Sequence, residues 1–247
     1  KVLLGVRDWS SDVCSSDLLH GGGKFITQEL ERHGIESRFV HGQRVTDETA
    51  LGVVEEVLVD KINRKLVETV LDFGSKAVSL TTHEYRCMRA ERLTISEADG
   101  PDRHGLSLGF VGRPAAADVA RIFAATEDHT VPVIAPLATG PDGETLNCNA
   151  DSVAAVVAAD LKAEKLVFLT DVPGILVPGP DGQPQLASTI TEREVGKLVD
   201  EGHISGGMMP KVKASIRALD AGVRKAHIID GRISHALLLE IFTEEGI

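Results

Sequence analysis

Apolar positions along this chain follow two spacings that alternate from one end to the other. Short apolar runs of about four to eight residues predict buried strands, and spacings of three to four residues predict amphipathic helices. The longest helical pattern covers residues 47–71, with Thr46 as its expected N-cap. Strands are expected at 1–6, 39–40, 77–80, 131–137, 165–170 and 226–229, and helices at 24–33, 47–71, 115–125, 150–161, 191–201, 208–221 and 234–242.

This alternation, with mostly short connections, predicts a three-layer α/β fold with a largely parallel central sheet. The composition agrees, because 43% of the 247 residues are hydrophobic, only 4% are aromatic, and 24 are glycines. Aliphatic cores of this kind suit parallel sheets covered by helices. A turn-rich loop at 138–146 indicates two lobes, residues 1–140 and 141–247.

Charge and cysteine spacing exclude several classes of function. The formal net charge is −11 and there is no basic run, which argues against a general nucleic-acid binder. Cys14, Cys87 and Cys148 are too far apart to indicate zinc or a disulfide framework, so a cytoplasmic protein is expected. No apolar run reaches about 18 residues, so no membrane span is expected.

Residues 7–17, RDWSSDVCSSD, do not fit the surrounding pattern. They are polar, rich in Ser and Asp, and have neither a helical nor a strand period. The segment is either a flexible loop or a foreign insertion, and the second interpretation is favoured by the family comparison below.

Two candidate segments in the first half of the chain lie where strands are expected to meet helices. The glycines of His20-Gly21-Gly22-Gly23 would let backbone N–H groups approach a phosphate or carboxylate, although many strand-to-helix turns contain glycine. The turn is neither GxGxxG nor a P-loop, which argues against a dinucleotide dehydrogenase. Arg44 precedes the long helix, where it could hold a carboxylate or simply be solvated.

The second half of the chain offers further candidates. Asn147, Asn149 and Asp151 alternate, so their side chains would converge in an extended stretch, or Asn149 could simply cap a helix. Residues 170–174 follow a buried strand, where α/β sheets bind ligands, or form a tight turn. Lys211 lies near a helix N-terminus, which favours an accompanying anion, or it is a surface lysine.

Taken in order, the motifs HGGG, GxRxTD, NxNAD, LTDVPG and GGMxPK resemble the acetylglutamate kinase branch of the amino acid kinase family. The similarity runs from about Leu18 to the end of the chain. It implies an αβα sandwich with a mostly parallel sheet. It also implies an N-terminal lobe that binds N-acetyl-L-glutamate and makes a dimer, a C-terminal lobe that binds ATP, and a role in arginine biosynthesis.

The resemblance also implies roles for individual residues. Gly22 and Gly23 would hold the side-chain carboxyl and the transferring phosphoryl group, and Arg44, Asn147 and Asn149 would bind the rest of the acyl amino acid. Asp151 would organise the catalytic lysines, and Lys211 would stabilise the charge of the transfer. Mg²⁺ would bridge the phosphates of ATP without a protein ligand. The nucleotide site would comprise Thr170, Asp171, Val172, Gly174, Ile175, Gly206, Gly207 and Met208.

The start of the chain departs from the family pattern. Family members carry a lysine at the end of the first strand, then a helix, then the strand that leads to HGGG. Here Gly5 stands roughly where that lysine is expected, Lys1 precedes the strand, and residues 7–17 replace the helix. The chain also stops short of the usual terminal strand. We therefore expect this chain to transfer phosphate poorly, and its intact parent to be active.

Two other functions stay open at this point. A related kinase of the same fold could act on acetylaminoadipate, aspartate, carbamate or UMP, since one methylene changes specificity by only about 1–3 kcal/mol. A non-catalytic arginine or nucleotide sensor could keep the fold without the chemistry. The family also suggests a homodimer or a hexamer built as a trimer of dimers, and a PII-type regulatory partner.

Overall fold

The computed structural model describes residues 2–7, 15–40, 42–81, 86–94, 107–179 and 181–242. Its strands are β1 (Val2–Arg7), β2 (Ser15–His20), β3 (Phe39–Val40), β4 (Gln43–Arg44), β5 (Ala77–Leu80), β6 (Met88–Arg92), β7 (Val111–Ala117), β8 (Val131–Ile134), β9 (Leu137–Thr139), β10 (Thr145–Cys148), β11 (Lys165–Thr170), β12 (Leu176–Pro178), β13 (Pro184–Leu186) and β14 (Lys225–Asp230). Its helices are α1 (Gly23–Arg32), α2 (Glu48–Glu55), the π-helix η1 (Glu56–Asn63), α3 (Arg64–Asp72), α4 (Val119–Ala125), the 3₁₀ turn η4 (Glu127–His129), α5 (Ala150–Asp160), α6 (Glu192–Asp200), α7 (Met208–Asp220) and α8 (Ala236–Phe242).

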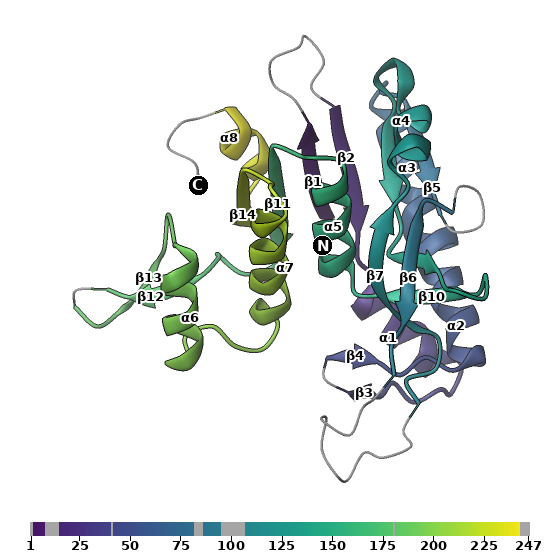
Figure 1. Ribbon diagram of the computed structural model, residues 1–247, viewed down its shortest axis with the longest axis horizontal. Coiled ribbons are helices and arrows are strands. Elements are labelled where there is room, and N and C mark those ends of the chain that lie inside the picture. Colours follow the sequence, from purple (N-terminus) through teal and green to yellow (C-terminus); the bar gives the residue numbers. More distant parts are fainter. Residues whose placement is uncertain are drawn as a thin grey trace.

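The central sheet has six strands in the order β14-β11-β1-β2-β8-β5 (Figure 1). Alternate residues of β11 face opposite layers. Leu166 and Phe168 join the main core with α5 and α7, whereas Val167 packs with Ala236 of α8. Helices therefore cover both faces of the sheet, and the predicted three-layer α/β fold is confirmed.

The first strand runs against the other described strands of this sheet. β1 pairs antiparallel with both β2 and β11, whereas β2–β8, β5–β8 and β11–β14 are parallel pairs. Only residues 8–14 separate β1 from β2, and a parallel connection needs a dozen or more residues. The prediction of no regular structure over 7–17 is wrong at its ends, since Arg7 belongs to β1 and residues 15–17 belong to β2.

The long predicted helix is continuous but changes its winding. It begins as α2, widens into η1, and ends as α3. Its N-cap is Asp47 and not Thr46: Asp47 Oδ1 accepts from the Ala50 N–H at 2.8 Å, whereas the buried Thr46 hydroxyl donates to Arg44 O. A carboxylate at the cap also suits the positive end of the helix dipole.

The prediction that a helix begins at residues 115–117 is wrong. They end β7, and α4 starts only after Asp118, whose side chain accepts from the Arg121 N–H. β7 forms a small closed barrel with β6, β9 and β10, which the sequence pattern did not predict. Alanine-rich β7 has a weak strand signal of its own, so pairing with β6 decides its conformation.

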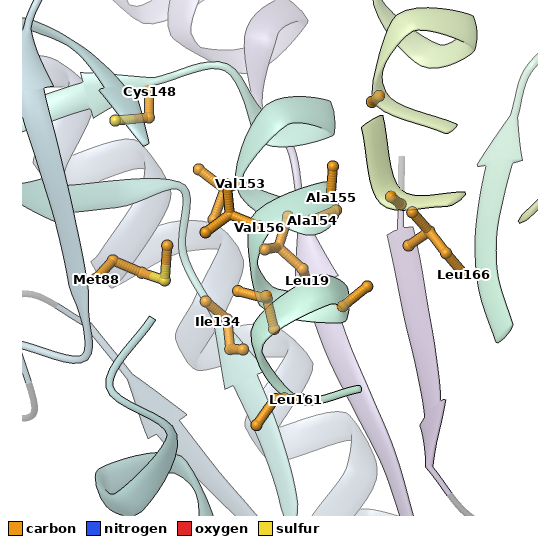
Figure 2. Close-up of a cluster of buried hydrophobic side chains, with 14 of the residues drawn as sticks. Leu19, Met88, Ile134, Cys148, Val153, Ala154, Ala155, Val156, Leu161 and Leu166 are labelled. Atoms are coloured by element: carbon orange, nitrogen blue, oxygen red, sulfur yellow. The ribbon is translucent and has the colours of Figure 1, made fainter. Parts of the chain in front are cut away.

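The main hydrophobic core draws on both halves of the chain. Figure 2 shows Leu19 and Ile134 beside Val153 and Val156 of α5, with Leu166 close by. A second core lies between α1, α2 and η1. The division into lobes at residue 140 stays a prediction, since sheet and main core are shared across it. None of the described helices is long and apolar enough to cross a membrane.

Candidate active site

A cavity of about 760 Å³ opens at the carboxyl ends of β2, β11 and β14, next to the N-termini of α1 and α5. The carboxyl ends of parallel strands are where open α/β sheets bind ligands. The predicted site residues that line this cavity are Gly22, Gly23, Arg44, Asn147, Asn149, Asp151, Thr170 and Asp171. Val172, Gly174, Ile175, Gly206, Gly207, Met208 and Lys211 are not part of its lining.

The two central glycines of the turn after β2 have different surroundings. A Cβ at Gly22 would lie 2.7 Å from Leu58 Cδ2 and 2.9 Å from Ile62 Cδ1, so the turn packs directly on η1. A Cβ at Gly23 would meet nothing within 4 Å. Gly22 is therefore required for packing, whereas Gly23 leaves open space at the first turn of α1, where backbone N–H groups favour an anion.

His20, at the end of β2, connects this turn to η1 through hydrogen bonds of its buried ring. Its ring is 1% exposed; Nδ1 lies 3.2 Å from Gly21 O, and Nε2 lies 3.1 Å from Asn63 Nδ2. Asn63 Nδ2 also donates to Val133 O at 2.9 Å. Because the amide nitrogen can only donate, Nε2 accepts and Nδ1 carries the proton that reaches Gly21 O. Asn63, at the end of η1, was not predicted as a site residue.

Burial lowers the pKa of His20 from 6.5 to about 4. The folded protein therefore keeps this ring neutral while the unfolded chain takes up a proton below about pH 6.5. The stability contributed by the neutral ring is complete above that pH and is lost as the pH falls towards 4, by roughly 3 kcal/mol in all.

Replacing His20 by Gln is expected to remove much of this acid sensitivity. Urea unfolding at about pH 7 and about pH 5 measures the free energy of unfolding above the window and within it. His33→Gln, at the exposed end of α1, is the matched control and should keep the full loss. An equal acid loss in His20→Gln and the unsubstituted chain would contradict the assignment.

Arg44 lies at the end of β4 and is 7% exposed. Its Nη2 donates to Gly23 O at 3.0 Å and to Thr27 Oγ1 at 2.9 Å, its Nη1 donates to the Ser37 hydroxyl, and its guanidinium stacks over the Phe39 ring. The interpretation of Arg44 as a solvated arginine is therefore wrong. The side chain is held beside the glycine turn by these hydrogen bonds, and its fixed positive charge can attract a carboxylate in the cavity.

Asn147, Asn149 and Asp151 all reach the cavity, by different routes. Asn147 lies in β10, and its Nδ2 donates a hydrogen bond to Thr46 Oγ1 at 3.1 Å. Asn149 caps α5 by accepting from the Ser152 N–H at 3.0 Å, so the capping interpretation is correct for this residue. Asp151 follows in the first turn of α5 and is 8% exposed.

Lys211 is not a surface lysine. Its side chain is 1% exposed, and Nζ donates to Asp151 Oδ1 at 2.6 Å while lying 5.5 Å from the centre of the Phe168 ring. The anion that its place near the start of α7 suggested is thus, in this structure, the carboxylate of Asp151. A buried charge with such a partner can be offered to a ligand in the cavity that Asp151 lines.

Two ion pairs at the cavity were missed by sequence reasoning. Lys24 Nζ lies 3.1 Å from Asp171 Oδ2, which joins α1 to the end of β11. Asp230 and Arg232 pair at the end of β14. The signal that could have found the second pair is its place directly after a predicted strand, the same rule that singled out residues 170–174.

Comparison with known proteins agrees with this arrangement. Residues 10–230 match the model of the amino acid kinase family. The chain is 44% identical over 232 residues to the acetylglutamate kinase of Syntrophus aciditrophicus (strain SB), covering 93% of this chain and 77% of the relative. A similar match, 44% identical and covering 93% of this chain and 74% of the relative, is the acetylglutamate kinase of Caldanaerobacter subterraneus subsp. tengcongensis.

Among solved structures, N-acetylglutamate synthase from Neisseria gonorrhoeae, complexed with coenzyme A and N-acetyl-glutamate, superposes with a TM-score of 0.77 at 27% identity. The match covers 93% of this chain and 50% of that one. The chain therefore belongs to the amino acid kinase family and, within it, to the acetylglutamate kinases.

Proposed function

We propose that this chain carries the site for ATP-dependent phosphorylation of the side-chain carboxylate of N-acetyl-L-glutamate, a reaction of arginine biosynthesis. One observation carries the proposal: the glycine turn, Arg44 and Asp151 all line a single cavity, and Asp151 pairs with the buried ammonium of Lys211. In the reaction, a carboxylate oxygen bonds to the γ-phosphorus of ATP, the bond from that phosphorus to the bridging oxygen breaks, and ADP leaves with the electron pair.

The acyl amino acid would lie between the glycine turn and the cap of α5. The N–H groups of Gly22 and Gly23 would hold the reacting carboxylate and the phosphoryl group, and Arg44 would hold the α-carboxylate. Asn147 and Asn149 also line the cavity and would bind the acetamido end. The open space over Gly23 supports this placement, since a ligand can approach its backbone closely.

Lys211 would supply positive charge to the equatorial oxygens of the transferring phosphoryl group, with Asp151 holding the ammonium in place. Phosphoryl transfer needs in-line positioning and charge stabilisation more than covalent help. Mg²⁺ would be bound by the phosphates of ATP and would neutralise part of their charge. The nucleotide would contact Thr170 and Asp171 at the cavity and reach out to Val172, Gly174, Ile175, Gly206, Gly207 and Met208.

An assay with ATP, Mg²⁺ and hydroxylamine tests the proposal by trapping the acyl phosphate as a hydroxamate. N-acetyl-L-glutamate and the longer acetylaminoadipate are compared, and calorimetry with each compound measures binding apart from turnover. Faster hydroxamate formation with acetylaminoadipate, or no reaction with and no binding of either acyl amino acid, would contradict the proposed substrate. Sedimentation at several concentrations tests the proposed homodimer or hexamer, and adding a PII-type protein tests that partner.

Arg44→Lys is expected to weaken binding of N-acetyl-L-glutamate about tenfold or more, because lysine keeps the charge but loses the hydrogen bonds to Gly23 O and Thr27 Oγ1 that fix its position. Calorimetry measures the dissociation constant, and affinity for ADP should be unchanged. Arg38→Lys, on an exposed arginine of the preceding segment, is the matched control. Equal affinities of Arg44→Lys and Arg38→Lys for the acyl amino acid would rule out the assigned role.

A second function has one observation in its favour. The reversed direction of β1 removes the end of the first strand from the cavity, which leaves a chain that binds ligands without efficient transfer. Such a chain would be a nucleotide and acyl-amino-acid binding protein. Binding of both ligands by calorimetry, with no hydroxamate formed, identifies this case.

A further inference from the structure

An arginine that no role above uses faces the cavity from the end of β14. β11 and β14 pair in parallel with Thr170 opposite Asp230, so both strands end at the same edge of the sheet (Figure 1). Gly231 and Arg232 come next and line the cavity together with the glycine turn. The Gly231 N–H donates to Thr170 O at 2.8 Å, which ties this short loop to β11.

Asp230 fixes the direction of the Arg232 side chain. Its Oδ1 accepts from the backbone N–H of Arg232 at 2.9 Å and from Nε at 2.8 Å, and its Oδ2 accepts from Nη2 at 2.7 Å. These hydrogen bonds lower the pKa of Asp230 to about 2, so the carboxylate stays ionised. Asp230 is 6% exposed, whereas 59% of the Arg232 side chain is exposed.

One edge of the guanidinium is thus occupied and the other is available. Nη1 of Arg232 makes no hydrogen bond to any residue that the structure describes. An arginine in this state offers a planar pair of donors, the geometry that matches phosphate oxygens. An exposed ion pair two residues apart adds little stability by itself, so stability alone is a weak reason for this arrangement.

The acidic residues at the cavity mouth do not prevent an anionic ligand from binding at Arg232. Asp171 follows β11 and Asp230 ends the neighbouring β14, and two unpaired carboxylates would repel a polyphosphate. Each has a cation beside it, Lys24 with Asp171 and Arg232 with Asp230. Lys24 stands on the first turn of α1, where no acidic residue is present, and Arg232 follows β14, so the two cations come from different elements.

We propose that Arg232, aimed by Asp230, is a further nucleotide-binding residue that holds the polyphosphate of ATP at the carboxyl end of β14. The inference rests on the proposed kinase function for the identity of the nucleotide. Asp230 acts through Arg232 and is its positioning residue.

Calorimetry with ADP and with adenosine tests this role in the full chain. Arg232→Ala is expected to weaken ADP binding about tenfold or more, the effect of a lost charge-assisted hydrogen bond, and to leave adenosine and N-acetyl-L-glutamate binding unchanged. Asp230→Asn should weaken ADP binding by less, because the arginine remains but is no longer fixed. Arg224→Ala, at the opposite end of β14 and paired with Glu164, is the matched control.

The outcomes separate this inference from the proposed function. If the unsubstituted chain binds ADP but forms no hydroxamate, the kinase function fails and the Arg232 comparison still decides the inference. Where Arg232→Ala lowers the unfolding midpoint, Arg232→Gln repeats the comparison with a side chain that still bonds to Asp230. ADP affinities of the Arg232 variants within twofold of Arg224→Ala, or no ADP binding by the unsubstituted chain, overturn the proposal.

Discussion

A chimera in which residues 1–17 are replaced by the corresponding N-terminal segment of the Syntrophus aciditrophicus relative is expected to form acyl phosphate at least about 10²–10³ times faster than this chain. That is the effect of losing one group that stabilises transition-state charge. No lysine occurs between Val2 and His20. The resemblance places a catalytic lysine at the end of the first strand, so this chain should transfer phosphate poorly.

The direction of β1 gives this expectation a structural reason. Arg7, at the end of β1, pairs with Ser15 at the start of β2, whereas the cavity lies beyond His20 at the other end of β2. At about 3.3 Å per residue, the end of β1 is roughly 16 Å from the edge of the sheet that bears the site. A lysine inserted at the end of β1 would therefore not restore the rate, whereas a parallel first strand with its helix would.

Hydroxamate formation measured for the chain and the chimera at equal concentration checks the prediction. The same chimera with its first-strand lysine changed to Met is the control, and its rate should fall back towards that of this chain. Equal rates for the chain and the unsubstituted chimera would show that residues 1–17 do not limit the reaction. The proposal that residues 7–17 are foreign would then lose its functional support.

Lys211→Met is expected to destabilise the fold by about 3 kcal/mol, because it leaves Asp151 as a buried carboxylate without its ammonium partner. The value is at the low end of the range for broken buried pairs, since 12% of the Asp151 side chain remains exposed. Urea unfolding measures the change. In the chimera, the same substitution should also slow phosphoryl transfer about 10²–10³-fold.

A double variant separates the pair from the packing around it. Lys211→Met with Asp151→Leu should recover most of the lost stability, since removing both charges leaves no uncompensated group. Lys213→Met, on the exposed side of the same helix, is the matched control and should change stability by less than about 0.5 kcal/mol. A loss in the double variant as large as in Lys211→Met would mean that the ion pair itself is not the cause.

Local patterns in the sequence determined much of this protein. The strands at 77–80 and 165–170 lie where their apolar runs predicted. The Asn149 cap forms as expected, and the predicted helix after Thr191 opens with a Thr191–Glu194 capping box, because a cap and its helix are only three residues apart. The ordered motifs also identified the family. Eight of the site residues proposed from them line one cavity, namely Gly22, Gly23, Arg44, Asn147, Asn149, Asp151, Thr170 and Asp171.

Other features depended on contacts between distant parts of the chain. The direction of β1 was decided by the short connection to β2 and by pairing with β11, which follows about 160 residues later. The conformation of residues 115–117 was decided by pairing with β6. Such pairings follow from register and closure, and neither is encoded in the periodicity of one segment.

The site residues also divide into those with a local sequence signal and those whose surroundings depend on long-range contacts. Glycines, caps and strand ends carry local signals, and the sequence by itself placed them. The partner of Lys211 lies 60 residues away, that of Lys24 lies 147 residues away, and Arg232 reaches the cavity only because β14 is seated beside β11. Burial and long-range pairing gave these charged side chains their surroundings, and only the tertiary structure brings such groups together.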